Sequence, residues 1–160
     1  MVDYHYNLGV SERGDLYNTT RSGLKMYGNS IHLYGLYNIN NRLSVGAGAG
    51  LDRYENTGHN TLPLFLTGHY VPIISIPHAY AYTNLGYAIP GSTFTEGMLL
   101  DLGIGYRKMF RRHFGMNFQF GYNLKQLKGE VLFIDDKEKM KTSDYSQWRH
   151  SLAFGVGFIF

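Results

Sequence analysis

The chain of 160 residues contains no cysteine, few prolines and few charged side chains. Without cysteine it can form neither a disulfide scaffold nor a thiolate metal site. With only 4 prolines it is neither collagen-like nor a disordered low-complexity chain. Charged residues make up 17% of the sequence, below the average of about 25%. The net charge of +3 is too mild to indicate a nucleic-acid-binding protein.

Long hydrophobic runs are also missing. No stretch reaches the roughly 18 consecutive apolar residues that a transmembrane helix needs. The mean hydropathy of −0.25 is typical of a soluble protein. A membrane-spanning β-barrel can have the same value, because its apolar residues occupy only every second position of each strand. The sequence therefore excludes a helical membrane protein and leaves a strand-based one open.

Aromatic residues and glycine are abundant, with 14 Tyr, 10 Phe and 20 Gly. Tyrosine and phenylalanine favour strands, and the chain has few good helix-forming runs. These features predict an all-β protein. The length is that of one domain, which we expect to span residues 1–160.

The clearest strand pattern lies at the end of the chain, in residues 148–160. Counting back from the end, every second residue is apolar or aromatic except His150, whereas the residues between them are mostly small or polar. A strand alternates its side chains between two faces, so this segment has one bulky apolar face. It resembles the closing strand of bacterial outer-membrane β-barrels, which typically ends in Phe. The resemblance implies a membrane-insertion strand formed by Phe154, Val156, Phe158 and Phe160.

The same alternation recurs along the rest of the chain, with connections that are alternately long and short. An even number of strands, with long loops at one rim and tight turns at the other, is the topology of outer-membrane barrels. The sequence therefore predicts an all-β fold, an eight-stranded antiparallel up-and-down transmembrane β-barrel. We expect its strands at residues 2–11, 26–39, 43–54, 61–71, 78–89 and 98–110, from residue 114 onward, and at the end of the chain.

A soluble ligand-binding barrel would have the same alternation with its apolar face inward. The apolar face of this chain is too bulky for an eight-stranded interior. Exposed to water, this face would form an apolar patch far larger than the few hundred Å² of the patches that soluble monomers expose. We therefore expect lipid outside and, inside, a polar network that plugs the lumen. The predicted network consists of Asp3, His5, His32, Asp52, Asp101, Arg107 and Arg149.

Two patterns could carry chemistry, and neither is strong. His5, His32 and His69 share the inward face, but their spacing does not establish a ligand geometry, so we predict no metal and no cofactor. Lipid-modifying barrel enzymes need a histidine beside a serine, with an orienting acid. Ser30 and His32 share a face with no acid evidently placed beside them. We predict no catalytic residue; an enzyme and a narrow channel remain alternatives.

The last connection predicts an interaction site. The alternation weakens after Leu124, and an apolar run then precedes a charged hairpin tip at residues 135–139. We expect the hairpin at residues 126–146 to project from the membrane and to dock a partner protein by β-augmentation. The candidate partner-binding residues are Val131, Leu132, Phe133 and Ile134.

In pattern, the whole chain resembles the small outer-membrane barrels, a family that includes outer-membrane protein X and the membrane domain of outer-membrane protein A. The resemblance implies a location in the Gram-negative outer membrane, from which we expect that a secretory signal was removed. It implies a non-enzymatic surface, structural or accessory-subunit protein that acts through its extracellular loops. The expected partners are outer-membrane lipid, the insertion machinery during biogenesis and another outer-membrane or extracellular protein, but not nucleic acid.

Overall fold

The computed structural model describes residues 1–160 except 56–57, 112 and 135–139. For residues 130–134 and 140–141 it describes the backbone alone. The described residues form ten strands and no helix long and apolar enough to cross a membrane. The strands are β1 (Val2–Gly14), β2 (Asn18–Thr20), β3 (Tyr27–Asn38), β4 (Leu43–Glu55), β5 (His59–Thr61), β6 (Pro63–Tyr70), β7 (Ala79–Ala88), β8 (Gly97–Arg111), β9 (Phe114–Ile134) and β10 (Met140–Ile159).

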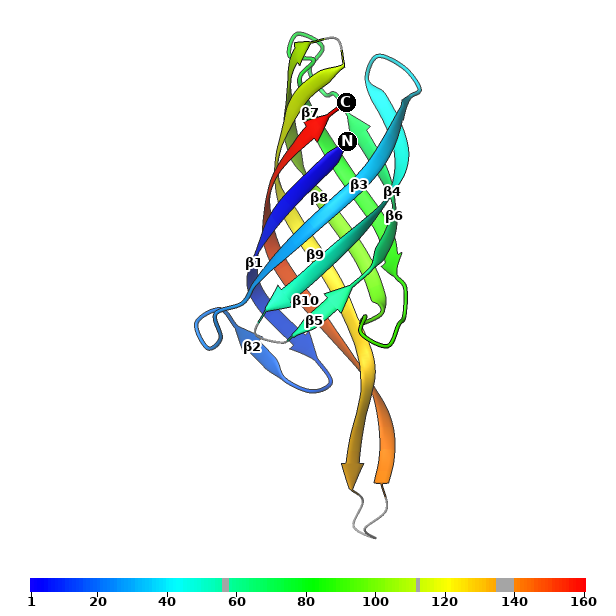
Figure 1. Ribbon diagram of the computed structural model, residues 1–160. Coiled ribbons are helices and arrows are strands. Elements are labelled where there is room, and N and C mark those ends of the chain that lie inside the picture. Colours follow the sequence, from blue (N-terminus) through cyan, green and yellow to red (C-terminus); the bar gives the residue numbers. More distant parts are fainter. Residues whose placement is uncertain (56–57, 112, 135–139) are drawn as a thin grey trace.

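Eight of these strands close into a barrel (Figure 1). Around the ring the order is β1-β3-β4-β6-β7-β8-β9-β10, each pair is antiparallel, and β10 pairs back with β1. The predicted eight-stranded barrel is therefore confirmed. The short strands β2 and β5 pair with β1 and β4 within two of the long connections, where the sequence predicts only loops.

The two ends of the barrel differ. Both termini and the tight turns lie at one end, which we call the turn end, whereas β2, β5 and the long connections lie at the other, the loop end (Figure 1). At the loop end, β9 and β10 continue beyond their neighbours. They pair with each other as far as Ile134 and Met140, whereas β8 follows β9 only to Lys125 and β1 follows β10 only to Gln147. This extension, which we call the β9–β10 ribbon, projects from the barrel.

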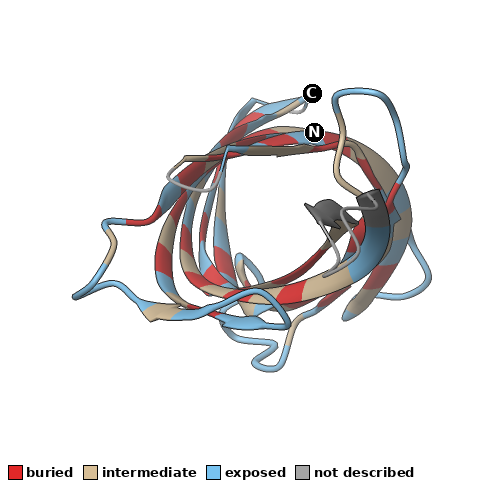
Figure 2. Ribbon diagram, turned by 90° about the horizontal axis from the view of Figure 1, so that it is seen from below, coloured by how far each residue is buried: buried red, intermediate tan, exposed pale blue. Residues whose placement is uncertain are grey.

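Burial alternates along each barrel strand (Figure 2). Large apolar side chains point outward, and Leu66 and Ile104 are 68% and 64% exposed. The inward positions are buried and mostly polar, as Ser30 and Asn84 are. A soluble barrel would have the opposite arrangement, because water penalises an apolar exterior of this extent.

Inward-facing glycines make room for large side chains in the narrow lumen. A Cβ on Gly105 would collide with the ring of Tyr80, and a Cβ on Gly103 or Gly121 would collide with Tyr82. Each tyrosine therefore lies flat across a neighbouring strand instead of standing upright in the lumen. The high glycine content of the chain thus reflects close approach of side chains to the barrel wall.

Candidate functional site: the filled lumen and the loop end

An ion pair spans the lumen near the loop end. The Lys125 ammonium on β9 lies 2.5 Å from Oδ2 of Asp52 on β4, and both side chains are at most 1% exposed. β9 and β4 are four steps apart around the eight-membered ring, so this contact joins opposite walls. Asp52 also accepts a hydrogen bond from Thr61 Oγ1 at 2.9 Å. Side chains therefore meet across the whole diameter at this level.

A second buried ion pair lies beside the first. Arg149 Nη1 on β10 lies 3.5 Å from Oε2 of Glu12 on β1. The same guanidinium donates to the carbonyl oxygen of Tyr27 at 3.1 Å and sits 4.9 Å from the centre of the Tyr54 ring. Glu12 is bound in addition by the Tyr17 hydroxyl at 2.6 Å, and burial raises the pKa of that hydroxyl.

Uncharged donors hold the carboxylate nearest the turn end. Asp3 Oδ2 accepts hydrogen bonds from the Tyr34 hydroxyl at 2.5 Å and from Asn117 Nδ2 at 2.8 Å. The Tyr80 hydroxyl donates to Asn117 Oδ1 at 2.5 Å and accepts from Gln119 Nε2 at 3.0 Å. Four wall strands, β1, β3, β7 and β9, are thereby joined through the interior.

Three further groups complete the network. Asp101 accepts from Asn84 at 3.1 Å and from Asn123 at 2.5 Å. Arg107 bonds to Nδ1 of His69, whose ring stacks on Tyr80 at 4.6 Å. His5 bonds to Gln119 at 2.6 Å.

The structure places all seven predicted lumen residues inside the barrel. Asp3, His5, His32, Asp52, Asp101 and Arg149 are buried, and Arg107 is partly exposed near the turn end. Glu12 and Lys125 also belong to the lumen network, although the sequence did not predict them there. Lys125 continues the inward alternation of Asn123, which could have revealed it. Glu12 could not have been found that way, because a register shift between Gly9 and Ser11 reverses the facing of the residues beyond it.

The prediction that no acid lies beside His32 is wrong. Asp52 Oδ1 is 2.9 Å from His32 Nε2. The nearby Ser30 hydroxyl accepts a hydrogen bond from Asn7 at 2.7 Å. An acid and a histidine are thus paired, but the pair is buried in the lumen, away from the lipid-facing surface. Among the described residues no group of three or more His, Cys, Asp or Glu could hold a metal ion.

A polar cavity of about 910 Å³ opens at the loop end, between the 90–96 connection and the base of the β9–β10 ribbon. Its charged lining consists of Asp15, Glu96, Lys128 and Asp144, with Tyr145 beside them. Asp15 fixes the base of the ribbon, because its carboxylate accepts from the amide of Ser146 at 2.9 Å. On the same rim, His59 bonds to Thr95 at 3.0 Å, and burial lowers the pKa of His59.

The predicted partner-binding residues fall in the ribbon. The backbone of residues 131–134 forms a strand that pairs with residues 140–143, which is the pairing expected of a hairpin. The side chains of Val131, Leu132, Phe133 and Ile134, and the whole tip at 135–139, lie outside the described residues. Of the insertion strand, Phe154, Val156, Phe158 and Phe160 all face outward and are exposed.

No protein-family model and no curated protein matches the chain. Several solved structures are distantly similar to the chain. A Pseudomonas aeruginosa FadL homologue has a TM-score of 0.46 and 12% identity, covering 99% of this chain, which spans only 48% of that structure. The outer-membrane protein AlkL, solved in DMPC bilayers, has a TM-score of 0.41 and 12% identity, covering 98% of this chain and 89% of AlkL. The KdgM porin has a TM-score of 0.39 and 11% identity, covering 99% of this chain and 98% of the porin.

These likenesses are distant, and the architecture follows from the strand pairing and surface of the chain itself. The outside is apolar, the inside is polar and crossed by ion pairs, and the ring leaves no open edge between its first and last strands. This organisation is that of a β-barrel that spans a membrane.

Proposed function

We propose that this protein is a non-enzymatic barrel of the bacterial outer membrane, and that it acts as a surface or accessory-subunit protein through its loop end. The Lys125–Asp52 ion pair carries the proposal, because it joins opposite walls of the lumen. A barrel filled at this level serves as a rigid support for the structures at its rim. The loop end would then face the cell exterior and the turn end the periplasm.

The filled lumen argues against a solute channel. To open a path past Lys125 and Asp52, the protein would have to separate two charges that are buried from water. Leaving one partner of a buried pair uncompensated costs about 3–5 kcal/mol. The neighbouring Arg149–Glu12 pair would have to be disturbed as well, since both pairs lie beside Tyr54.

The β9–β10 ribbon is the structure best suited to bind another protein. Beyond Lys128 on β9 and Ser146 on β10, whose backbone is still bonded to Asp15, the pairing with the flanking barrel strands has ended. The outer edges of the ribbon therefore carry backbone amides and carbonyls without a neighbouring strand of the barrel, and an extended segment of a partner could pair with them. The cavity at its base offers both acidic and basic side chains to the same partner.

The experiment is a deletion of residues 128–142 in the full-length protein. The variant and the wild type are purified by affinity from the native envelope, and the copurifying proteins are compared. We expect the deletion to lose specific partners while the barrel still folds, as judged by its heat-modifiable migration on a gel. A shortened β2–β3 loop, lacking residues 22–24, serves as a control at the same rim and should keep them.

An unchanged set of partners, with both barrels folded, would refute the role of the ribbon. A shift in the mass of lipid A on expression would instead indicate the enzyme alternative, and would refute the non-enzymatic assignment.

A further inference from the structure

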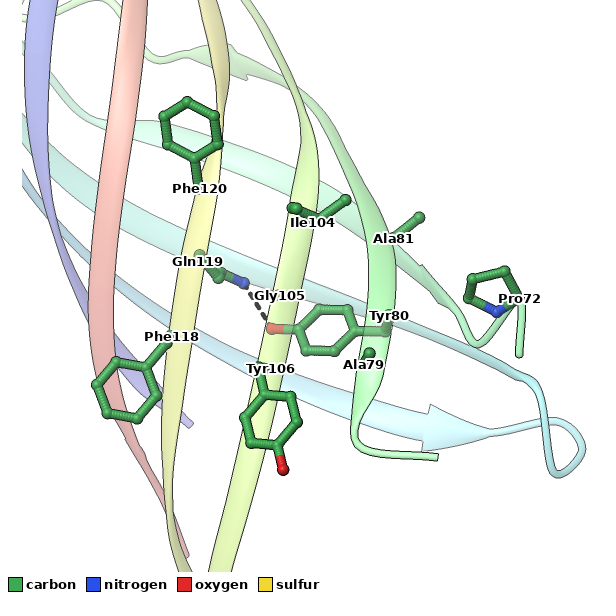
Figure 3. A pocket seen from close by; sticks show the side chains of 10 residues that line it. All are labelled: Pro72, Ala79, Tyr80, Ala81, Ile104, Gly105, Tyr106, Phe118, Gln119 and Phe120. Carbon is green, nitrogen blue, oxygen red and sulfur yellow. Dashed lines mark hydrogen bonds between the residues drawn. The ribbon is translucent and has the colours of Figure 1, made fainter. Parts of the chain in front are cut away.

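An apolar groove of about 440 Å³ lies on the outer wall of the barrel near the turn end (Figure 3). Its shape follows from the strand register. Ala79 and Ala81 on β7 face Tyr106 and Ile104 on β8, which in turn face Phe118 and Phe120 on β9. Two small side chains beside two rows of large ones leave a hollow along β7. Pro72, from the turn between β6 and β7, lines the groove as well.

That turn is itself apolar and exposed. Its residues Ile73, Ile74 and Ile76 are exposed, between the two prolines 72 and 77. A turn in water is usually polar, because its backbone and side chains face solvent. Three exposed isoleucines beside an apolar groove indicate instead that this rim enters the lipid boundary.

The rim around the groove is basic. The turns at this end, residues 39–42, 71–78 and 109–113, contain no acidic residue. Lys108 is exposed two positions beyond Tyr106, which places it on the same outward face of β8, past the end of the groove. Arg42 is also exposed, and its carbonyl accepts a hydrogen bond at 2.8 Å from Val71, next to Pro72. Positive charge therefore flanks the groove on both sides.

We propose that this groove binds one acyl chain of an anionic glycerophospholipid from the leaflet at the turn end, whose phosphate is attracted by the positive charges of Lys108 and Arg42. The hollow along Ala79 and Ala81 accepts the chain, and the basic rim selects a headgroup of net negative charge. Zwitterionic lipid gains the same apolar contact but not the attraction of the charges. The site thus has a chemical preference that a uniform lipid-facing surface lacks.

The test uses the full-length protein reconstituted in vesicles of equal parts phosphatidylglycerol and phosphatidylcholine. The protein is then extracted in mild detergent, and the retained lipid is counted by native mass spectrometry. We expect the wild type to retain one phosphatidylglycerol in preference to phosphatidylcholine. Arg42→Gln with Lys108→Gln should lower that preference by about fivefold for each charge removed, the factor that corresponds to about 1 kcal/mol per basic residue.

The groove is tested separately with Ala81→Trp, which fills the hollow and leaves every charge in place. Because Ala81 faces outward, the bulkier side chain meets lipid and not the lumen network; Ala79→Leu is the substitute if the tryptophan variant does not fold. Either change should abolish retention. The controls are Arg13→Gln with Arg53→Gln, which remove two exposed charges at the loop end, and Leu33→Trp elsewhere on the outer wall.

Equal retention of the two lipids by the wild type would overturn the proposal. So would retention that survives both the charge and the groove variants, or that falls equally in the controls.

Discussion

Placing an arginine at Val156 should strongly impair folding into a bilayer. Val156 faces outward on β10, is 39% exposed, and pairs with Tyr4 on one side and Phe118 on the other. It lies four residues from Phe160. At 3.4 Å per residue and a tilt of about 45°, it is about 10 Å along the membrane normal from the end of the chain. With an apolar band about 25 Å tall, this position is close to the midplane.

An arginine near the midplane costs about 2–4 kcal/mol, whereas one near the interface costs about 0–1 kcal/mol. Val156→Arg should therefore lower the free energy of unfolding by the larger amount, and Phe160→Arg by the smaller. The assay is equilibrium folding into phospholipid vesicles as a function of urea concentration, followed by the heat-modifiable gel shift. If water surrounded this face, an arginine at an exposed site would change the stability by less than about 0.5 kcal/mol. Equal and small effects at both sites would refute the assignment of the outer face.

Three further predictions concern the interior and the rim. Lys125→Met should lower the free energy of unfolding by about 3–5 kcal/mol in the same assay, because it leaves Asp52 buried without its cation. Adding Asp52→Asn should recover most of the loss. Full stability of the single variant would contradict the role of the pair. In planar bilayers the wild type should show no steady conductance, and a stable open level would contradict a filled lumen. Because burial lowers the pKa of His59, the folded protein binds a proton there less readily than the unfolded chain, so the contact with Thr95 should weaken as the pH falls below the ordinary pKa of 6.5. After correction for the intrinsic exchange rate, hydrogen exchange at residues 59–61 and 95–96 should be faster at pH 5 than at pH 7, and His59→Gln should remove most of that difference. A corrected rate that depends on pH equally in both proteins would contradict this prediction.

The barrel could be predicted from the sequence because a strand that separates lipid from a polar lumen needs strict alternation. On β9, for example, Phe118 and Phe120 face outward, whereas Gln119 between them faces the polar lumen. The alternation also placed the seven lumen residues inside. It could not show which of them meet, because the partners are set by register and tilt around the closed ring.

Asp52 shows that limit most clearly. Its partners Lys125 and His32 come from the opposite wall and from the adjacent strand, 73 and 20 residues away in the sequence. Glu12 was missed for a different reason, since the bulge near Ser11 interrupts the alternation on which every other assignment depended. The groove beside Ala79 and Ala81 likewise required the pairing of β7 with β8, which no single strand pattern reveals.

The most direct test of a lipid-covered outer face uses the absence of cysteine in this chain. Single cysteines at Leu152, Phe154, Val156, Phe158 and Phe160 can each carry a spin label in the protein reconstituted in vesicles. Collision with oxygen, which concentrates in lipid, is then compared with collision with a water-soluble nickel complex. The structure predicts that the ratio of oxygen to nickel collisions is highest at Phe154 and Val156 and falls toward Phe160. A nickel complex that reaches all five positions equally would show that water, and not hydrocarbon, covers this face.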